Sequence, residues 1–271
     1  MMNKILSSLI LIGLAFQLVA SDVTIKSKNL DNSQNDAGST NFYFTPDKLL
    51  IENKFKSDNS SLIFDSGKKE FVFIDHTRKE FYQVTEGELK QFIGQLRQMV
   101  PMMKALMANL PPDQQEKLKK QLGPILGEQQ PATTFSKTAS NVKVMKWSTD
   151  QYEAAQGNEK IADMFLASYS NLGVNKSDFQ SFEAMKRVFG EIIGEFAGVL
   201  PLGPSIAGLA SNLDENPAFD TGVPVRSVTY KNGTQSGENL VQSVSKGGIN
   251  SSMFAIPSGY ARKKLEMPKM R

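Results

Sequence analysis

The sequence contains no cysteine and a single histidine, His76, among its 271 residues. Without cysteine, the chain can form no disulfide, thiolate nucleophile or cysteine-ligated metal site. One histidine excludes a histidine-rich metal site, and a serine hydrolase triad would have to use it as the base. Because His76 lies between Asp75 and Thr77 in a predicted hairpin turn, we expect a surface residue. The sequence predicts no cofactor and no enzyme activity.

An excess of charge of one sign is also lacking. The chain has 31 Lys and Arg against 28 Asp and Glu, a formal net charge of +3. Nucleic-acid binding requires a concentrated basic face. The one basic cluster, Arg262 to Lys264 with Lys269 and Arg271, lies at the C-terminus, where a solvated tail is the simpler interpretation. The composition therefore argues against a nucleic-acid partner.

Long apolar runs are scarce, and the clearest one follows Lys4 near the N-terminus. It is shorter than the roughly 20 residues that a membrane span needs, and it ends in small residues, as a secretory signal peptide does. Ser21 stands where a bacterial lipoprotein carries its acylated cysteine. We therefore expect residues 1–21 to be a cleaved signal peptide. Residues 22–271 should then form one soluble domain without a transmembrane segment, periplasmic or secreted from a bacterial envelope.

The mature chain is rich in short β-type runs separated by turn residues, a pattern typical of an antiparallel meander. Residues 22–29 alternate as an opening strand, and the polar residues 31–40 are expected to form a loop. Further strands are predicted over Thr133–Trp147 and Tyr152–Met164. The Asn232-Gly233 pair is a strong hairpin signal between two late strands. The meander itself is expected from these runs: FYFT, KLLIENKF, SLIF, EFVFID and EFYQV.

Two longer segments have apolar residues at intervals of three and four, which indicates amphipathic helices. The first should run from Glu86 to Leu110 with a kink at Pro101, followed by a polar helix through Leu122. The second should start near Ser177 as N-cap. The fold class is therefore α+β, with a curved antiparallel sheet, an incomplete barrel, wrapped around two main amphipathic helices.

Two further patterns match known sites in spacing alone. Ser66 and Lys69 have the Ser-x-x-Lys spacing of penicillin-binding enzymes, but the serine falls in a predicted turn rather than at a helix start. Residues 31–36 begin like a calcium loop, but Asp36 replaces the required glycine and Phe42 the final acid. We expect the first match to be chance, and the second leaves open only a weak, irregular cation site.

The methionine-rich face of the first helix carries the best functional indication. Methionine fills irregular gaps and adaptable binding surfaces, and burying such a side chain is worth roughly 1.5–3 kcal/mol. This face therefore either packs on the sheet or lines a cavity for an apolar ligand, and both hold if the sheet curves away from it. For a cavity, the two helices supply these candidate lining residues: Phe92, Leu96, Met99, Met103, Met107, Phe189, Ile193 and Phe196.

Six segments of the chain occur in an order that is typical of one protein family. They are FYFTPDKLLIE, IFDSGKKEFVFIDHTRKEFYQVTEGEL, NLPPDQQEKL, NLGVNKSDF, GVPVRSVTYKNG and INSSMFAIPSGY. Together they resemble an uncharacterised bacterial envelope family, number 4412 in the domain-of-unknown-function series. Such proteins look like relatives of the periplasmic lipoprotein-carrier fold, an incomplete antiparallel barrel around helices. The resemblance implies that architecture and brings no catalytic residues.

The function that we expect from the sequence is non-enzymatic binding of a lipid or lipoprotein acyl chain in the concave face of the half-barrel. The glycine- and proline-rich segment from Gly198 to Gly208 is the candidate lid. The main alternative is an interaction or structural module that holds another envelope protein on an edge strand or on the same apolar face. A hydrolase, third, would need Ser66 and His76, or an acidic pair, to meet in a cleft.

Overall fold

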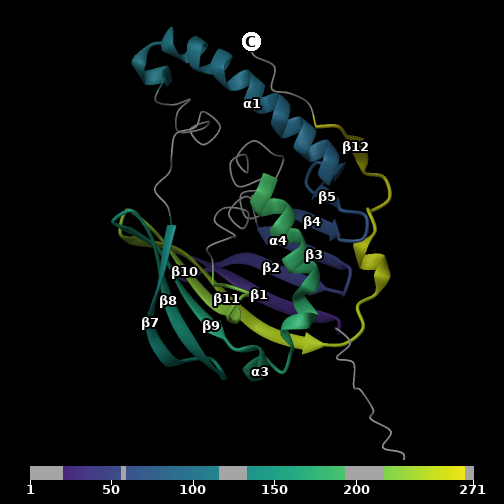
Figure 1. Cartoon of the computed structure of the whole chain (residues 1–271). Helices are drawn as coiled ribbons and strands as arrows, with labels where there is room; N and C mark the ends of the chain where they lie inside the picture. The colour runs from purple at the N-terminus through teal and green to yellow at the C-terminus, as the bar shows by residue number, and fades with distance from the viewer. Residues whose placement is uncertain (1–20, 56–58, 116–132, 193–216, 266–271) are drawn as a thin grey trace, which may run out of the picture.

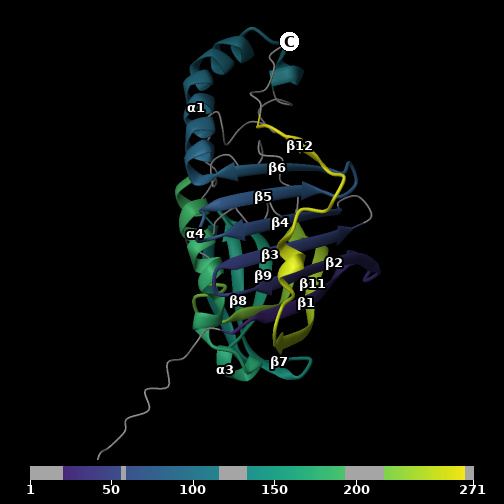
Figure 2. The same cartoon turned by 90° about the vertical axis from the view of Figure 1, so that its right-hand side faces the viewer.

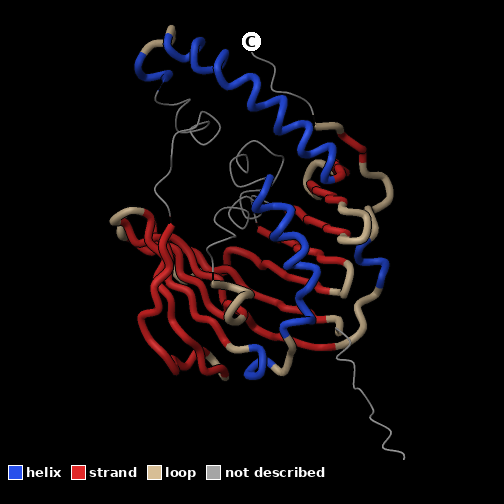
Figure 3. Tube along the Cα trace, viewed as in Figure 1, coloured by secondary structure: helices blue, strands red, loops and turns tan. Residues whose placement is uncertain are grey.

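A computed structural model describes residues 21–55, 59–115, 133–192 and 217–265, apart from the side chains of 189–192. Twelve strands form one sheet in the order β12-β6-β5-β4-β3-β2-β1-β11-β10-β9-β8-β7 (Figure 3). Neighbouring strands are antiparallel, except that β12 is parallel to β6. The strands are β1 (Val23–Asp31), β2 (Asp36–Phe44), β3 (Lys48–Phe55), β4 (Asn59–Asp65), β5 (Glu70–Asp75), β6 (Glu80–Thr85), β7 (Thr133–Val144), β8 (Trp147–Gln156), β9 (Glu159–Ala167), β10 (Val223–Lys231), β11 (Thr234–Lys246) and β12 (Ala261–Lys263).

The sheet curves strongly, so that β7 to β10 face β2 to β4 across a concave side (Figure 1). Its two edge strands, β12 and β7, lie at opposite ends of the strand order, and among the described strands the sheet does not close. The structure confirms the expected α+β class and the expected curved antiparallel sheet that does not close into a barrel.

Strands β3 to β5 read as nearly continuous apolar runs because both of their faces are buried. Alternate side chains enter two separate clusters. The inner core, on the concave side, includes Ile51, Leu62 and Phe73. The outer core, on the convex side, consists of Tyr43, Leu50, Ile63, Val72, Ile74 and Phe81.

The C-terminal segment covers the outer core. After β11 the chain crosses the convex face of the sheet and returns to the edge strand β6 as β12 (Figure 2). Met253 and Phe254 of η2 (Ser251–Phe254), followed by Ile256 and Tyr260, pack on the outer core. The segment thus gives the meander a second buried face.

The helices are α1 (Glu86–Ala108), α3 (Tyr169–Leu172), the 3-10 helix η1 (Lys176–Phe179) and α4 (Gln180–Ile192). Helix α4 packs on β3 and β4, and α1 contacts β6 and α4. Only the first half of α1 is buried, through Leu89, Phe92, Ile93 and Leu96. Its second half extends beyond the sheet (Figure 1). The expected wrapping of the sheet around two main helices is therefore not confirmed. None of the described helices is long and apolar enough to span a membrane.

Two local predictions were wrong, and a third was correct except for its N-cap residue. The polar segment 31–40 is mostly strand, because β2 starts at Asp36. The strand expected to end at Trp147 ends at Val144 and turns through Met145, which has a positive φ of 51°. Trp147 instead begins β8. The second main helix starts near Ser177 as expected, since η1 begins at Lys176 and continues into α4, but its N-cap is Asn175 and Ser177 lies inside η1.

Candidate functional site

A cavity of about 410 Å³ lies on the concave side of the sheet. Strands β1 to β3 line it on one side and β9 to β11 on the other, with α4 and the 217–222 turn adding further side chains. This volume lies in the range typical of small-ligand sites, roughly 300–1,000 Å³. The site is therefore formed mainly by strands that are far apart in the sequence.

Most of the cavity wall is apolar. It includes Phe42, Phe55 and Met164 from the strands, together with Phe182 of α4 and Phe219. The rings of Phe182 and Phe219 pack with their centroids 4.3 Å apart, and both side chains are almost fully buried. An aromatic pair at this distance adds favourable ring–ring contact to its apolar burial, and it forms one side of the cavity wall.

The turn between α4 and β10 holds Phe219 in place. Phe219 has a positive φ of 64°, its backbone N–H donates to the Gly222 carbonyl at 2.7 Å, and its carbonyl accepts the Tyr169 hydroxyl. A Cβ on Gly222 would lie 2.5 Å from the Ala167 carbonyl oxygen, so only glycine fits there. Burial raises the pKa of the Tyr169 phenol, and the charge of Glu183 adds to the shift; the hydroxyl therefore stays protonated and able to donate.

One part of the wall is polar. Four residues from four neighbouring strands, Asn239, Asn29, Thr40 and Asn53, form a hydrogen-bonded row that we call the amide row. The Nδ2 of Asn239 donates to Asn29 Oδ1 at 2.8 Å, and Asn29 Nδ2 donates to Thr40 Oγ1 at 3.1 Å. Thr40 Oγ1 donates to Asn53 Oδ1 at 2.9 Å. Strand register creates this row, since Asn29 lies opposite Asn239 and Thr40 opposite Asn53.

The cavity wall carries no Asp, Glu, Lys, Arg or His among the described residues that line it. Arg226 and Glu238, which are next in sequence to the lining residues Ser227 and Asn239, pair with each other at 2.8 Å. The hydrogen bond from Arg226 lowers the pKa of the Glu238 carboxyl, although burial opposes the shift. The described wall can bind a neutral, largely apolar group, but it offers no counter-ion to a charged one.

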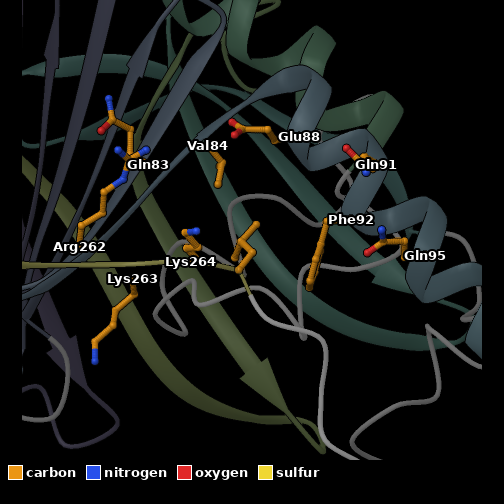
Figure 4. A pocket seen from close by; sticks show the side chains of 10 residues that line it. Gln83, Val84, Glu88, Gln91, Phe92, Gln95, Arg262, Lys263 and Lys264 are labelled. Carbon is orange, nitrogen blue, oxygen red and sulfur yellow. The ribbon is translucent and has the colours of Figure 1, made fainter.

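A second pocket, of about 490 Å³, lies between β6, the first turns of α1 and the segment around β12. Figure 4 shows Phe92 extending into it from α1, with Gln91 and Gln95 on the same helix. Arg262 and Lys264 line its opposite side. Its wall is half polar and bears charges of both signs, so it is less suited to an apolar ligand than the concave cavity.

A third pocket, of about 320 Å³, lies on the convex face beneath the C-terminal segment and includes Ser61 and His76. His76 is in the predicted turn, but it is half-buried rather than a surface residue. Its Nε2 lies 2.8 Å from Ser61 Oγ, and its Nδ1 lies 3.0 Å from the Tyr260 hydroxyl. Burial lowers the pKa of the His76 imidazole, and the charge of Glu52 opposes this shift without reversing it.

This serine–histidine contact is poorly placed for hydrolysis. The other ring nitrogen of His76 meets the Tyr260 hydroxyl instead of the carboxylate of a triad, and the C-terminal segment covers this face of the sheet. Ser66, the serine considered from the sequence, lies in the turn between β4 and β5, and its hydroxyl donates to the Asp47 carbonyl. Among the described residues, no group of three or more His, Cys, Asp and Glu could hold a metal ion.

The eight residues predicted to bind a ligand fall into three groups according to their position in the structure. Leu96 is buried in the inner core and Phe92 lines the second pocket. Met99, Met103 and Met107 are half-buried along α1. The side chain of Phe189 lies outside the described part of the chain, as do Ile193, Phe196 and the candidate lid from Gly198 to Gly208. Their role in binding stays a prediction, and none of the eight is among the described residues of the concave cavity.

Sequence reasoning missed the amide row and most of the strand residues of the cavity. One indication was present in the sequence. Polar side chains occupy alternate positions in two segments that can form strands, with Ser27 and Asn29 in the first and Thr40 in the second. Alternation of this kind predicts a polar patch on one face of a sheet. Recognising it would have required the register between β1 and β2.

Comparison with known proteins gives only weak structural likenesses. No protein-family profile matches the sequence, and no curated protein matches it. An uncharacterised conserved protein from Thermus thermophilus is 7 % identical, with a TM-score of 0.45 and coverage of 91 % of this chain and 92 % of the other. PNGF-II is 9 % identical, with a TM-score of 0.39 and coverage of 91 % and 31 %. MucB is 6 % identical, with a TM-score of 0.36 and coverage of 90 % and 60 %. At these scores the likenesses assign neither a family nor a function, and the resemblance to family 4412 stays a prediction.

Proposed function

We propose that this protein binds an apolar ligand, a lipid or acyl chain, in the cavity of the concave face and performs no chemistry on it. The observation that carries this proposal is the cavity itself, which combines a volume of about 410 Å³ with an aromatic and aliphatic wall free of charge in its described part. A wall of this composition removes apolar ligand surface from water, which is worth roughly 25 cal/mol per Å².

The contacts around the potential catalytic groups support binding without catalysis. The Ser61–His76 pair lies on the opposite face of the sheet from the cavity, beneath the C-terminal segment. Catalysis would need a nucleophile or an acid–base group within reach of the ligand. In the cavity, the described polar side chains are amides and hydroxyls, which bind a ligand through hydrogen bonds and do not titrate near neutral pH.

A probe-binding assay tests the proposal. N-phenyl-1-naphthylamine becomes fluorescent in apolar surroundings, and we expect it to bind the protein and to be displaced by dodecane and its derivatives. Ala162→Phe places a ring in the cavity from β9 and should weaken probe binding at least tenfold. Ala105→Phe, the same change at an exposed site on α1, should leave binding unchanged. Equal binding by both variants, at equal folded fractions, would show that the probe sits elsewhere.

The alternative function, a protein-interaction module of the envelope, is favoured by one observation. Met102 and Leu106, in the second half of α1, are each 51 % exposed. Large apolar side chains gathered on an exposed surface mark interaction sites. A protein partner that co-purifies with the unaltered chain, and is lost from a Met102→Gln, Leu106→Gln variant, would favour this alternative.

A further inference from the structure

The amide row ends in a hydrogen-bond donor without a partner. Asn53 is 0 % exposed and lines the concave cavity. Its Oδ1 accepts from Thr40, but its Nδ2 has no hydrogen-bond partner among the residues that the structure describes. Leaving a buried donor unpaired costs roughly 1–3 kcal/mol. Of the six buried side-chain atoms without a partner among the described residues, only Asn53 Nδ2 belongs to a residue that lines the cavity.

The direction of the hydrogen bonds in the row is fixed by a backbone carbonyl. Ser27 Oγ donates its single proton to the Thr40 carbonyl, which can only accept. Ser27 Oγ must therefore accept from Asn239 Nδ2, at 2.8 Å. The same Nδ2 then donates to Asn29 Oδ1, which turns Asn29 Nδ2 toward the Thr40 hydroxyl.

The rest of the row follows from the proton of Thr40. Its hydroxyl accepts from Asn29, and its own proton goes to Asn53 Oδ1. The amide of Asn53 is thereby oriented with Nδ2 as the free end of the row. The unpaired group is thus a donor and not an acceptor, and a complementary ligand must supply a hydrogen-bond acceptor.

The charge of that acceptor follows from the cavity wall. No cation lines the cavity in its described part, and Arg226 is already paired with Glu238. A carboxylate or phosphate would be desolvated there without a counter-ion, which is strongly unfavourable. A carbonyl oxygen requires no counter-ion and accepts one hydrogen bond at little desolvation cost.

We propose that the cavity selects ligands with a neutral acyl carbonyl, as in an ester or an amide, which accepts a hydrogen bond from Asn53 Nδ2 while the chain lies against the apolar wall. This inference rests on the proposed function and narrows it. It distinguishes esterified or amide-linked acyl chains from free fatty acids, which carry a carboxylate at neutral pH.

The test compares four ligands of equal chain length in the displacement assay at pH 8: dodecane, methyl dodecanoate, N-methyl dodecanamide and dodecanoate. The ester and the amide should bind roughly threefold to tenfold more tightly than dodecane, as expected for one net hydrogen bond. Dodecanoate should bind more weakly than the ester. Equal affinity for dodecane and the ester, or tighter binding of dodecanoate, would overturn the inference.

Two variants test whether Asn53 is the source of the preference for a carbonyl-containing ligand. Asn53→Leu removes the donor at similar size and should abolish the preference for ester over alkane, measured as the ratio of the two affinities in the same variant. Thr229→Val is the control, since Thr229 also lines the cavity but its hydroxyl already donates to the Gly237 carbonyl. A preference that persists in Asn53→Leu would overturn the inference. If that variant does not fold, the ligand series on the unaltered chain still decides.

The acyl-carbonyl inference and the proposed function are contradicted by different results of the ligand series. Binding of all four ligands without preference would contradict the acyl-carbonyl inference and leave the proposed function standing. Failure of every ligand, dodecane included, to displace the probe would contradict both.

Discussion

Asp178 is a fully buried residue whose carboxylate joins three segments that are distant in the sequence. It accepts the backbone N–H of Asn175 at 2.8 Å and pairs with Lys246 at 2.9 Å. In the full chain it also accepts the N–H of Ser21, the last residue of the expected signal peptide, at 2.8 Å. Burial alone would raise the pKa of the Asp178 carboxyl. The backbone donors and the Lys246 ammonium outweigh burial and hold this pKa below its usual value. The charged carboxylate thus stabilises the junction of β11, η1 and the start of β1.

Replacing Asp178 with asparagine should therefore lower the free energy of unfolding by about 1.5–3 kcal/mol, the range for hydrogen bonds to charged groups. The depressed pKa means that the carboxylate's contribution is complete above about pH 4 and is lost as the pH falls through the folded-state pKa. Urea unfolding of both proteins between pH 7 and pH 3 measures this, and the difference should shrink at the acid end. Asp113→Asn, at an exposed site, should cost little at any pH; an equal loss there would contradict the assignment.

The buried imidazole of His76 should give the protein's stability a second dependence on pH, because here the neutral form is favoured in the folded state. Its pKa is lowered from 6.5 chiefly by burial, so the folded state favours the neutral ring. The contribution of the neutral His76 ring to the free energy of unfolding should be complete above about pH 6.5. It should fall as the pH drops toward the folded-state pKa, because the unfolded chain binds the proton more readily. Thermal unfolding at pH 7.5 and 5.5 should show this loss in the wild type. His76→Gln should lack this part of the loss, and an unchanged pH dependence in the variant would exclude His76 as its source.

At the scale of elements, the start of α1 is fixed by a capping box. Thr85 Oγ1 accepts the Glu88 backbone N–H at 3.2 Å, and a Glu88 carboxylate oxygen accepts the Thr85 N–H at 2.8 Å. Thr85→Ala should lower the free energy of unfolding by about 1 kcal/mol, the usual cost of losing an N-cap side chain. Thr85→Ser keeps the hydroxyl and should recover most of that loss in the same denaturation assay. A serine variant as unstable as the alanine variant would show that the cap is not the cause.

The elements that sequence reasoning predicted well are those with local causes. Strands β3 to β6 were predicted from apolar runs broken by turn residues, and the β10–β11 hairpin from Asn232-Gly233, where both residues have the positive φ that this turn needs. The β7–β8 turn was missed because it is made by Met145, which adopts a positive φ without any residue typical of turns. The start of β2 was missed because its polar side chains look like a loop until their partners in β1 are known.

At the scale of the whole molecule, the curvature of the sheet was predictable, but the residues that line the cavity were not. A concave site was expected from the amphipathic helices alone. The concave cavity described here instead joins β1 to β3 with β9 to β11, which are separated by more than a hundred residues of chain. Which side chains meet there depends on strand order and register, and neither follows from local periodicity.

Native mass spectrometry with lipid extraction shows whether the concave cavity holds an apolar ligand. The protein, purified from its native host without detergent, should carry a discrete added mass that extraction identifies as a lipid or acylated compound, and Ala162→Phe should lose it. Protein that is free of ligand as purified, and that takes up none of the four dodecyl compounds when they are added, would contradict the account.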